Sequence, residues 1–408
     1  MNILDTSAIN NCTSCGVCAS VCARKAVSMQ LDENGFYRPV IDYSFCNDCG
    51  LCTTVCYKFD SDVKQTSEDQ LEEKKLYAAW AKDEDIIRKT TSGGIADILA
   101  HALYDRGYKV VGVVYNKAKD RAEHRLANTD EDLIQIRGSK YIQSYTFEAF
   151  KEIVANCRKE KYAVFGTPCQ IYALNKMTTK KRVRDNFVFI DLYCHGCPSM
   201  CVWTKYKQDI TKKIGSNNFS NVVFRSKKRG WGTGYTMEIN TADGKSYLSK
   251  KAKDSFYELF FSDYLLNESC YDCKMRSTLE YTDIRLGDFW GKKFVRNHRG
   301  VSGVSVATAV GGGIFGLIEK EIEYQECGFE DLHPWQSWNV TYPQNKQVRD
   351  AVLCSLRSGK EDIYDAVKTL REGQGLKKNI IREVKAALSY LPQRFTDYIR
   401  IITYALRN

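Results

Sequence analysis

The sequence predicts an α+β fold in three parts: a cysteine-rich N-terminal domain, a mixed-sheet α/β domain and a helical C-terminal tail. Eight cysteines stand in two equally spaced runs within the first 60 residues. From Leu76 onward, short apolar runs alternate with apolar residues at helical spacing, and helical spacing continues from 344 to the end. A chain of 408 residues has room for two or three domains.

The N-terminal domain, residues 1–60, carries a duplicated cysteine motif. The spacing C-x2-C-x2-C-x3-C occurs at Cys12, Cys15, Cys18 and Cys22, and again at Cys46, Cys49, Cys52 and Cys56. This doubled run is typical of two-cluster bacterial ferredoxins, in which the fourth cysteine of each run ligates the other cluster. We therefore assign one [4Fe–4S] cluster to Cys12, Cys15, Cys18 and Cys56, and a second to Cys46, Cys49, Cys52 and Cys22. A structural zinc site is the alternative, but zinc prefers paired knuckles.

Short elements connect the two runs. Residues 26–29 and 37–41 read as strands around an Asn34-Gly35 turn. The proline that usually follows the fourth cysteine is absent, and Ala23 and Tyr57 stand in its place. Residues 60–75 are polar, acid-rich and free of aromatic residues, so we predict a linker there.

The second domain is expected at 76–339 and the helical extension at 340–408. Its predicted strands lie at 76–80, 109–115, 162–165, 187–190, 222–224, 235–240, 247–248, 283–286 and 303–310, and its predicted helices at 95–104, 147–159 and 255–266. An Asp243-Gly244 turn closes the hairpin onto the strand at 247–248. The uncharged run 301–318 is about the minimum length of a membrane span. Its Gly, Ser, Thr and Ala content favours a strand, a loop and the start of a buried helix.

Composition bounds the class of protein. Seventeen cysteines, an odd number in a long chain, argue against a disulfide-stapled protein. Residues 1–11 contain an acid and no base, so we expect no signal peptide and a reduced, cytoplasmic protein that uses cysteine for metal. The net charge of +10 fits a solvated basic face or a docking face for an acidic electron carrier. No basic cluster is interleaved with aromatics, so nucleic acid is not an expected partner.

Two further patterns can carry chemistry. Cys169, Cys194 and the pair Cys270-x2-Cys273 lie near predicted strand ends, where they could converge on a third cluster or be incidental buried thiols. Residues 90–94, Thr-Thr-Ser-Gly-Gly, open a predicted helix. Its N-terminus offers N–H groups to a phosphate, although a serine N-cap with flexible glycines explains the motif equally.

Six short motifs in a fixed order resemble a known family. They are Thr91-Ser92-Gly93-Gly94, residues 138–144 (GSKYIQS), residues 166–170 (GTPCQ), Cys194-His195-Gly196, Cys270-x2-Cys273 and residues 287–291 (GDFWG). Together, over roughly 75–340, they resemble the beta subunit of coenzyme F420-reducing hydrogenase and its dehydrogenase relatives. A fused two-cluster front end is also common in that group.

The resemblance implies a mixed-sheet flavin domain with non-covalent FAD and a third [4Fe–4S] cluster. The implied cluster ligands are Cys169, Cys194, Cys270 and Cys273. Cys197 and Cys201 depart from the family pattern, so the fourth ligand stays open between Cys194 and Cys197. The implied flavin contacts are Ser92, Gly93, Gly94, Ser139, Lys140, Tyr141, Gly287 and Asp288. No catalytic residue is assigned; the candidates are Lys140 and His195, and His195 reads equally as a hydrogen-bonding neighbour of a ligand.

The sequence therefore predicts an iron–sulfur flavoprotein oxidoreductase. It would pass electrons between a two-electron partner and a soluble one-electron carrier or partner redox protein. The two-electron partner is a deazaflavin, a nicotinamide or an organic substrate, with a substrate of polysaccharide synthesis among the options. The alternative is a non-catalytic electron-transfer subunit of a larger complex. The apolar stripe at 395–406 predicts a helix packed on the domain, with membrane contact the less favoured interpretation.

Overall fold

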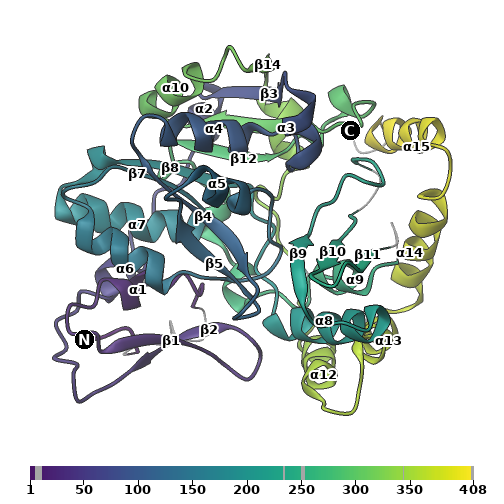
Figure 1. Ribbon diagram of the computed structural model, residues 1–408, viewed down its shortest axis with the longest axis horizontal. Coiled ribbons are helices and arrows are strands. Elements are labelled where there is room, and N and C mark those ends of the chain that lie inside the picture. Colours follow the sequence, from purple (N-terminus) through teal and green to yellow (C-terminus); the bar gives the residue numbers. More distant parts are fainter. Residues whose placement is uncertain (5–11, 233–234, 250–252, 343, 406–408) are drawn as a thin grey trace.

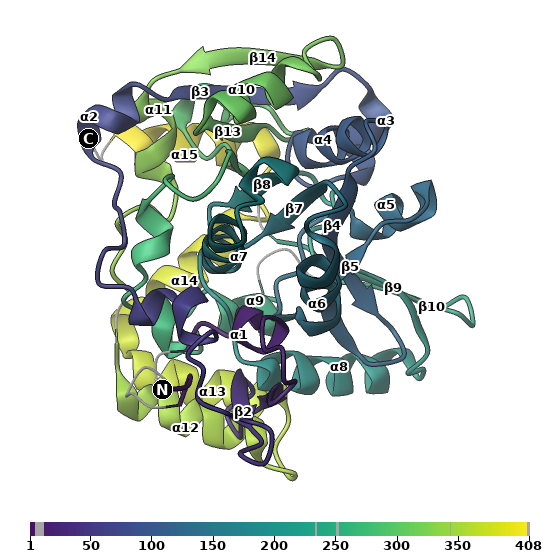
Figure 2. The same cartoon turned by 90° about the vertical axis from the view of Figure 1, so that its left-hand side faces the viewer.

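The structure is a computed structural model that describes residues 1–4, 12–232, 235–249, 253–342 and 344–405. Figures 1 and 2 show a central sheet flanked by helices, with the cysteine-rich N-terminal domain against one end and the last two helices along one edge. The fold class predicted from the sequence, α+β with a mixed sheet and a helical tail, is confirmed.

Nine strands of the described residues form one mixed sheet in the order β14-β3-β13-β12-β8-β7-β4-β5-β6. The pairs β12–β8, β8–β7, β7–β4 and β5–β6 are parallel and the others antiparallel. Their bounds are β3 Lys75–Ala81, β4 Lys109–Asn116, β5 Arg121–Leu126, β6 Ser144–Tyr145, β7 Tyr162–Gly166, β8 Phe187–Leu192, β12 Ile284–Asp288, β13 Ser302–Val306 and β14 Ile322–Cys327.

Two smaller sheets flank the large one. β1 Val27–Leu31 and β2 Tyr37–Ile41 pair antiparallel across the predicted turn, where Gly35 has a positive φ of 76°. β9 Phe219–Val223, β10 Glu238–Thr241 and β11 Ser246–Leu248 form an antiparallel sheet in the order β11-β10-β9.

The helices account for most of the remaining chain. The α-helices are α1 Val17–Ser20, α2 Glu68–Glu72, α3 Glu84–Lys89, α4 Ile95–Tyr104, α5 Asp130–Ile136, α6 Phe147–Asn156, α7 Pro168–Lys181, α8 Met200–Ile214, α9 Ser255–Phe260, α10 Ala309–Gly316, α11 Phe329–Leu332, α12 Lys346–Arg357, α13 Ile363–Gln374, α14 Leu376–Leu388 and α15 Gln393–Ala405. Single 3-10 turns are η2 Thr53–Val55, η3 Tyr57–Phe59, η4 Arg184–Asn186, η5 Glu268–Cys270, η6 Lys274–Ser277, η7 Lys292–Phe294 and η8 His333–Trp335.

Side chains that alternate in direction along the central strands contribute to two separate apolar cores, one on each face of the sheet. Val110, Ala163 and Val188 pack with α4 and α10 on one face, whereas Val164 and Phe189 pack with α6 and α7 on the other. Successive side chains of a strand point to opposite faces, so a strand buried on both faces reads as an unbroken apolar run. This explains why the runs at 162–165 and 187–190 were readable as strands.

Of two segments singled out in the sequence, one differs from the prediction and one agrees with it. The segment 60–75 contains α2 and is bound to the body, because Asp60 accepts hydrogen bonds from Tyr172 and Lys176. The uncharged run 301–318 holds β13 followed by α10, as predicted. No helix in the described part of the chain combines the length and the apolar character that crossing a membrane requires.

Candidate functional site

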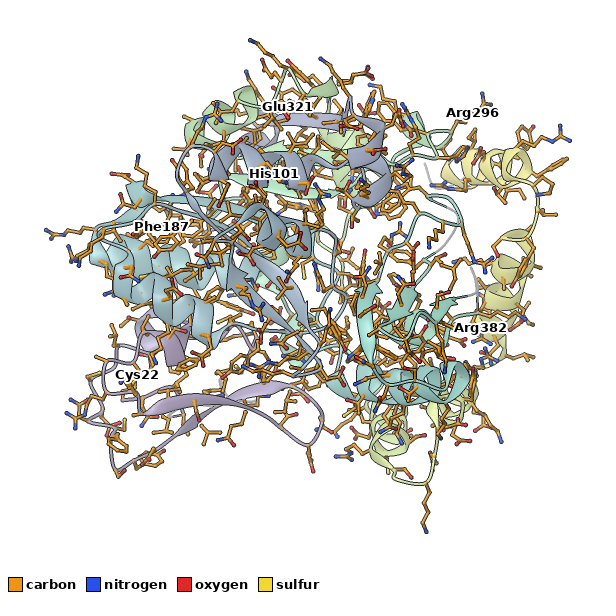
Figure 3. All side chains as sticks on the ribbon, viewed as in Figure 1. Cys22, His101, Phe187, Arg296, Glu321 and Arg382 are labelled. Carbon is orange, nitrogen blue, oxygen red and sulfur yellow. The ribbon has the colours of Figure 1, made fainter. Side chains whose placement is uncertain are left out.

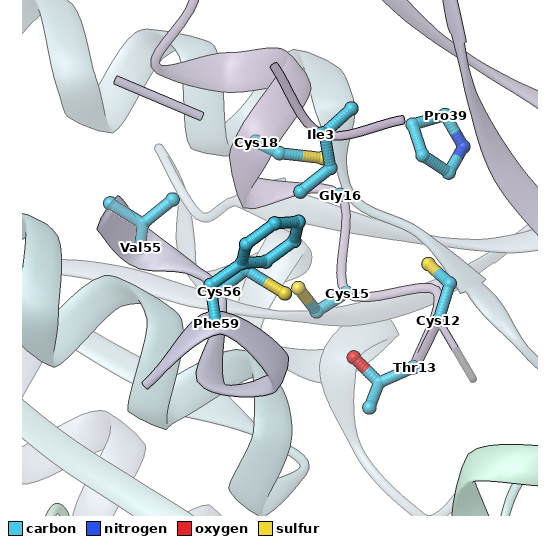
Figure 4. Close-up of a pocket in the computed structure, with 10 residues that line it drawn as sticks. All are labelled: Ile3, Cys12, Thr13, Cys15, Gly16, Cys18, Pro39, Val55, Cys56 and Phe59. Atoms are coloured by element: carbon cyan, nitrogen blue, oxygen red, sulfur yellow. The ribbon is translucent and has the colours of Figure 1, made fainter. Parts of the chain in front are cut away.

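The first thiol set lines one small pocket in the N-terminal domain. Cys12, Cys15, Cys18 and Cys56 face this pocket from both cysteine runs, and Figure 4 shows the sulfurs of Cys15 and Cys56 directed toward each other. Gly16 caps α1 with φ 75°, and a Cβ there would lie 2.1 Å from the Thr146 hydroxyl oxygen. The structure thus gathers the four cysteines that the sequence assigned to one cluster.

Burial makes this set a poor place for isolated thiolates. Together with the neighbouring thiols, burial raises the pKa of Cys15 to about 11 and that of Cys56 to about 12. Burial also raises the pKa of Cys12 and Cys18, and Cys18 interacts with the thiols of all three partners. An iron–sulfur cluster binds thiolates, so its cationic iron would offset the cost of this burial.

The second thiol set lies nearer the surface. Burial raises the pKa of Cys52, and the Cys22 thiol adds to the effect, so these two members are close. Cys22 and Cys46 pack against the apolar cluster that contains Cys18 and Cys52, whereas Cys49 is exposed. Figure 3 labels Cys22 within the N-terminal domain.

A third group of thiols converges from four chain segments. Cys169 is the second residue of α7, Cys194 and Cys197 follow β8, and Cys270 and Cys273 border η5 and η6. The Cys197 N–H donates to the Cys270 Sγ at 3.4 Å, and the thiols of this group act electrostatically on one another. The geometry brings Cys194 and Cys197 together with the other three, so it leaves the fourth ligand open.

The third group borders the first. Burial raises the pKa of Cys169 and the Cys15 thiol adds to the effect, and the two side chains pack against the same apolar core. Within the described residues, no three or more His, Cys, Asp or Glu side chains are grouped tightly enough to hold a single metal ion. The remaining cysteines lie apart: Cys157 packs behind α6, Cys327 ends β14, Cys354 is exposed on α12, and Cys201 faces the Glu33 carbonyl.

Two arginines that the sequence reading missed hold the cysteine loops. Arg276 donates to the carbonyls of Cys194, His195 and Cys270 at 3.3, 3.2 and 2.7 Å. Arg38 donates to the Cys12 carbonyl at 2.6 Å. Neither stands in a motif, so only a folded structure reveals that they link distant cysteine loops.

The predicted flavin residues lie near one another. The Ser139 N–H donates to the Thr91 hydroxyl at 3.2 Å, the Ser92 hydroxyl donates to the Val301 carbonyl at 2.6 Å, and Tyr141 packs edge-on against Tyr235. Burial raises the pKa of Asp288, and Ser92 acts to lower it. Between them lies the buried guanidinium of Arg225, 3.6 Å from the Tyr235 ring centre, 4.0 Å from that of Trp231 and 3.6 Å from Asp288. The structure therefore unites the start of α4, the residues after α5 and the end of β12.

The glycines of this site approach protein atoms. A Cβ on Gly93 would lie 2.3 Å from the Ala79 carbonyl oxygen and 2.9 Å from the Ser302 nitrogen. The Gly94 Cβ would lie 2.9 Å from Ile86, and that of Gly287 would meet the Tyr193 ring at 2.9 Å. The packing of α4 on β3 and β13 thus accounts for Gly93 without a phosphate.

The two candidate catalytic residues are both fully engaged. The Lys140 ammonium donates to the carbonyls of Gln135, Ile136 and Arg137 at the end of α5, which uses its three N–H groups. Burial lowers the pKa of Lys140 to about 7. His195 hydrogen-bonds to Asp263 at 2.8 Å and to the Tyr342 hydroxyl at 3.0 Å. A flavin contact through Lys140 would require it to leave these carbonyls.

Comparison with known proteins agrees with this geometry. Family models match a 4Fe-4S dicluster domain at 11–58, the coenzyme F420 hydrogenase/dehydrogenase beta subunit N-terminal part at 76–151 and its C-terminal part at 159–330. The chain belongs to the coenzyme F420 hydrogenase/dehydrogenase beta subunit family. The resemblance inferred from six short motifs is therefore confirmed, and with it an oxidoreductase family with a two-cluster iron–sulfur front end.

Individual relatives of the family are distant. The coenzyme F420 hydrogenase subunit beta of Methanococcus voltae is 27% identical over 128 residues, which is 30% of this chain and 45% of that protein. The chain thus spans less than half the length of this curated relative. Among solved structures, a chain of the xenon-derivatized F420-reducing [NiFe] hydrogenase complex from Methanosarcina barkeri is 19% identical, with a TM-score of 0.45, over 74% of this chain and 93% of that chain.

Proposed function

We propose that this chain is an oxidoreductase that passes electrons between a two-electron carrier and a row of three [4Fe–4S] clusters. The observation that carries the proposal is that Cys15 and Cys169, which belong to different domains, pack against the same apolar core. The first cluster would bind at Cys12, Cys15, Cys18 and Cys56, and the second at Cys22, Cys46, Cys49 and Cys52. Cys169, Cys270, Cys273 and either Cys194 or Cys197 would hold the third.

The order of these sets supports a relay. Cys49 is exposed, Cys52 and Cys18 pack in one apolar cluster, and Cys15 and Cys169 pack against one apolar core. Thiols therefore follow one another from the surface of the N-terminal domain into the larger domain. The protein sets the spacing and access of such cofactors, while the redox chemistry belongs to the cofactors themselves.

We also propose FAD as the two-electron cofactor, held around Arg225. Flavin supplies the exchange between paired and single electrons. The site suits a planar, anionic group because a buried guanidinium lies against Trp231 and Tyr235, with Lys227 and Trp290 nearby. Ser92, Gly93 and Gly94 would form a wall of the FAD site without binding its phosphates. The Ser92 hydroxyl already donates to the protein backbone, and Gly93 and Gly94 are already packed against protein atoms.

Cofactor content tests both proposals on the full chain. Protein purified without oxygen should contain about twelve iron and twelve sulfide, four of each per cube. A count near eight would leave only the N-terminal clusters and overturn the third. Arg225→Lys keeps a charge beside Asp288 but loses the planar stack, so it should lower flavin occupancy and leave iron unchanged. Arg371→Lys, which keeps its charge beside Glu258 elsewhere, is the control.

The second candidate function is an electron-transfer subunit whose partner performs the chemistry. The name of the Methanococcus voltae relative, a hydrogenase subunit, favours it. The two functions differ in one measurement. The oxidoreductase should reduce a viologen with a deazaflavin or a nicotinamide by itself, whereas a pure electron-transfer subunit should require its partner protein.

A further inference from the structure

We propose that α14 and α15 form a docking face for an anionic membrane surface. This proposal goes beyond the proposed function and does not depend on any cofactor. The two helices run along one edge of the molecule, on the right in Figure 1, and each is about 20 Å long at 1.5 Å per residue. Their apolar side chains face away from the body.

In α14 the polar side points inward. Asn379 donates to the Arg371 carbonyl at 2.7 Å, and Arg382, labelled in Figure 3, pairs with Glu258 at 3.1 Å. Ala386, on the same helix face as these two, is the only buried residue of this helix. Lys253 holds Glu383 at 3.1 Å. Polar bonds to the body therefore anchor this helix.

The opposite side of α14 is apolar and exposed. Leu376, Ile380 and Val384 recur every four residues, with Ile381 beside them, so they share one face of the helix. Leu376 is 76% exposed. An amphipathic helix that packs on its own domain normally buries its apolar face, whereas α14 exposes this face and packs through its polar one.

The same reversal occurs in α15. Thr396 and Asp397 are buried, and Asp397 pairs with His298 at 3.0 Å. Phe395, Tyr398 and Ile402, spaced by three and four residues, are exposed on the outside. The sequence favoured a helix packed on the domain through this stripe. The structure instead packs the helix through its polar side, where Asp397 pairs with His298 of the body.

The turn between the helices continues the apolar edge. Tyr390 and Leu391 are exposed like the stripes on either side. Nine large apolar residues of this edge are between 42% and 76% exposed: Leu376, Ile380, Ile381, Val384, Tyr390, Leu391, Phe395, Tyr398 and Ile402. Contiguous apolar surface of this kind marks an interaction site. Aromatic residues at such an edge suit the boundary between lipid headgroups and acyl chains.

The positive charge of this segment favours an anionic membrane as its binding partner. Residues 376–402 contain six Lys or Arg and two acids, a net charge of +4. Both acids have partners on the body: Glu383 pairs with Lys253, and Asp397 with His298. Lys377, Lys385 and Arg394 are exposed beside the apolar stripe. Basic residues flanking an apolar helix face attract anionic lipid, each contributing about fivefold in binding.

Vesicle flotation tests the proposal. Full-length protein should float with vesicles of phosphatidylcholine and phosphatidylserine, float less with phosphatidylcholine alone, and dissociate in high salt. Ile380→Ser/Val384→Ser/Tyr398→Ser should abolish flotation. Lys377→Glu/Lys385→Glu should weaken it roughly 25-fold or more, at about fivefold per lost cation. The controls are Val310→Ser, which is exposed on α10, and Lys159→Glu/Lys180→Glu, away from this edge.

Other occupants appear as distinct outcomes. If wild-type protein is a dimer by light scattering and the triple serine variant is a monomer, the face binds a second copy and the membrane proposal fails. If wild-type protein ignores anionic vesicles, or the triple variant floats equally, the proposal also fails. Circular dichroism and iron content should be unchanged in every variant, since the altered side chains are exposed.

A separate observation concerns Tyr57, in the position usually occupied by proline. We infer that its hydroxyl donates a hydrogen bond to a sulfur of a bound cluster and raises the reduction potential of that cluster. This inference rests on the proposed function. Tyr57 is 5% exposed, and its hydroxyl has no hydrogen-bond partner within the described part of the chain. Buried hydroxyls are almost always paired, so this one requires an acceptor.

Thiol sulfurs are candidate acceptors around Tyr57. Its ring belongs to the apolar core against which Cys15, Cys169 and Cys273 pack, and it lies edge-on to Tyr172 at 5.9 Å. The thiols of Cys273, Cys169, Cys270 and Cys56 all act electrostatically on its hydroxyl. It therefore lies between the first and third thiol sets. Hydrogen bonds to cluster sulfurs stabilise the more electron-rich, reduced state.

Tyr57→Phe separates this role from packing. The variant should keep its iron, while one cluster shifts to lower potential in a titration followed by electron paramagnetic resonance. Tyr162→Phe, in the same core but without these thiol neighbours, should shift nothing. Unchanged potentials with full iron would overturn the Tyr57 role. Wild-type protein lacking the third cluster would instead overturn the proposed function.

Discussion

Single residues decide whether the third thiol group is a cluster site. Cys273 lies at the start of η6 and acts on Cys169, Cys194 and Cys270. We expect Cys273→Ala to remove about four iron, one cube, and to spare the N-terminal clusters. Iron and sulfide analysis of anaerobically purified protein measures this. Cys354→Ala, on the exposed face of α12, should lose none.

The same assay distinguishes the two possible fourth ligands. Cys194 and Cys197 both adjoin Cys270, and Arg276 holds the Cys194 carbonyl. The alanine variant that loses four iron identifies the cysteine that is the fourth ligand. If both variants and Cys273→Ala keep full iron, the five cysteines are only packed thiols.

A substitution at Gly93 tests whether this glycine is required for packing or for a flavin phosphate. Gly93→Ala should destabilise the protein by about 1–3 kcal/mol or more, because its Cβ would press on the backbone of β3 and β13. Iron and flavin should then fall together as the fold weakens. Gly107→Ala, at φ 78° with nothing within 4 Å of its Cβ, should cost about 1–2 kcal/mol from backbone strain alone. Urea unfolding compares the two; selective flavin loss in Gly93→Ala would restore a phosphate contact there.

At the scale of elements, a buried ion pair joins the third thiol group to the sheet. Arg285 on β12 holds Asp191 on β8 through two bonds of 2.7 and 2.6 Å, and the side chains are 1% and 2% exposed. Arg285 also donates to the Arg276 carbonyl at 2.9 Å, which anchors the loop after Cys273. The pair thus connects strand pairing with cluster geometry.

Breaking this pair should be costly. Arg285→Met leaves the Asp191 carboxylate buried without its partner, and we expect a loss of about 3–5 kcal/mol in the free energy of unfolding. The double variant Arg285→Met/Asp191→Leu should recover much of the loss, because no charge remains buried. Denaturant titration measures both. Equal losses in the single and double variants would show that the bonds to the loop, rather than charge, stabilise this region.

Elements with periodic apolar residues were readable from the sequence. The predicted strands at 162–165 and 187–190 are the buried β7 and β8, and the predicted helix at 95–104 is α4. The long helix α7 was missed, although Thr167, Pro168 and Gln170 form its capping box, because its apolar residues are interrupted by polar ones.

Long-range geometry explains what the sequence could not provide. The ligand sets of the two N-terminal clusters follow from spacing, and the structure gathers the first set around one pocket. The convergence of Cys169, Cys197 and Cys270 depends instead on the parallel pairing of β7, β8 and β12. Likewise, periodicity identified the apolar stripe of α15 but not the side on which the helix packs, which Asp397 and His298 determine.

For the whole molecule, the exposed end of the thiol row indicates where electrons leave. Cys49 is exposed, and Tyr43, Phe45 and Leu51 around it are between 40% and 64% exposed. Residues 1–70 hold five Lys or Arg and nine Asp or Glu, a net charge of −4. This end therefore combines an apolar contact patch with acidic surroundings, which suits a one-electron carrier with a basic docking face.

The last prediction concerns this end. Tyr43→Ser/Phe45→Ser should slow electron exchange with a basic carrier, such as a cytochrome c used as probe, by about fivefold or more, because docking loses its apolar anchors. The wild-type rate should also fall as salt screens the acidic surroundings. Stopped-flow absorbance measures both effects. Methyl viologen needs no docking, so its rate should be unchanged in the variant, and Tyr324→Ser, an exposed aromatic on β14, should change neither rate. If the double variant reacts with the carrier as fast as wild type while retaining its iron, electrons leave the protein elsewhere, and the row of thiols does not end at Cys49.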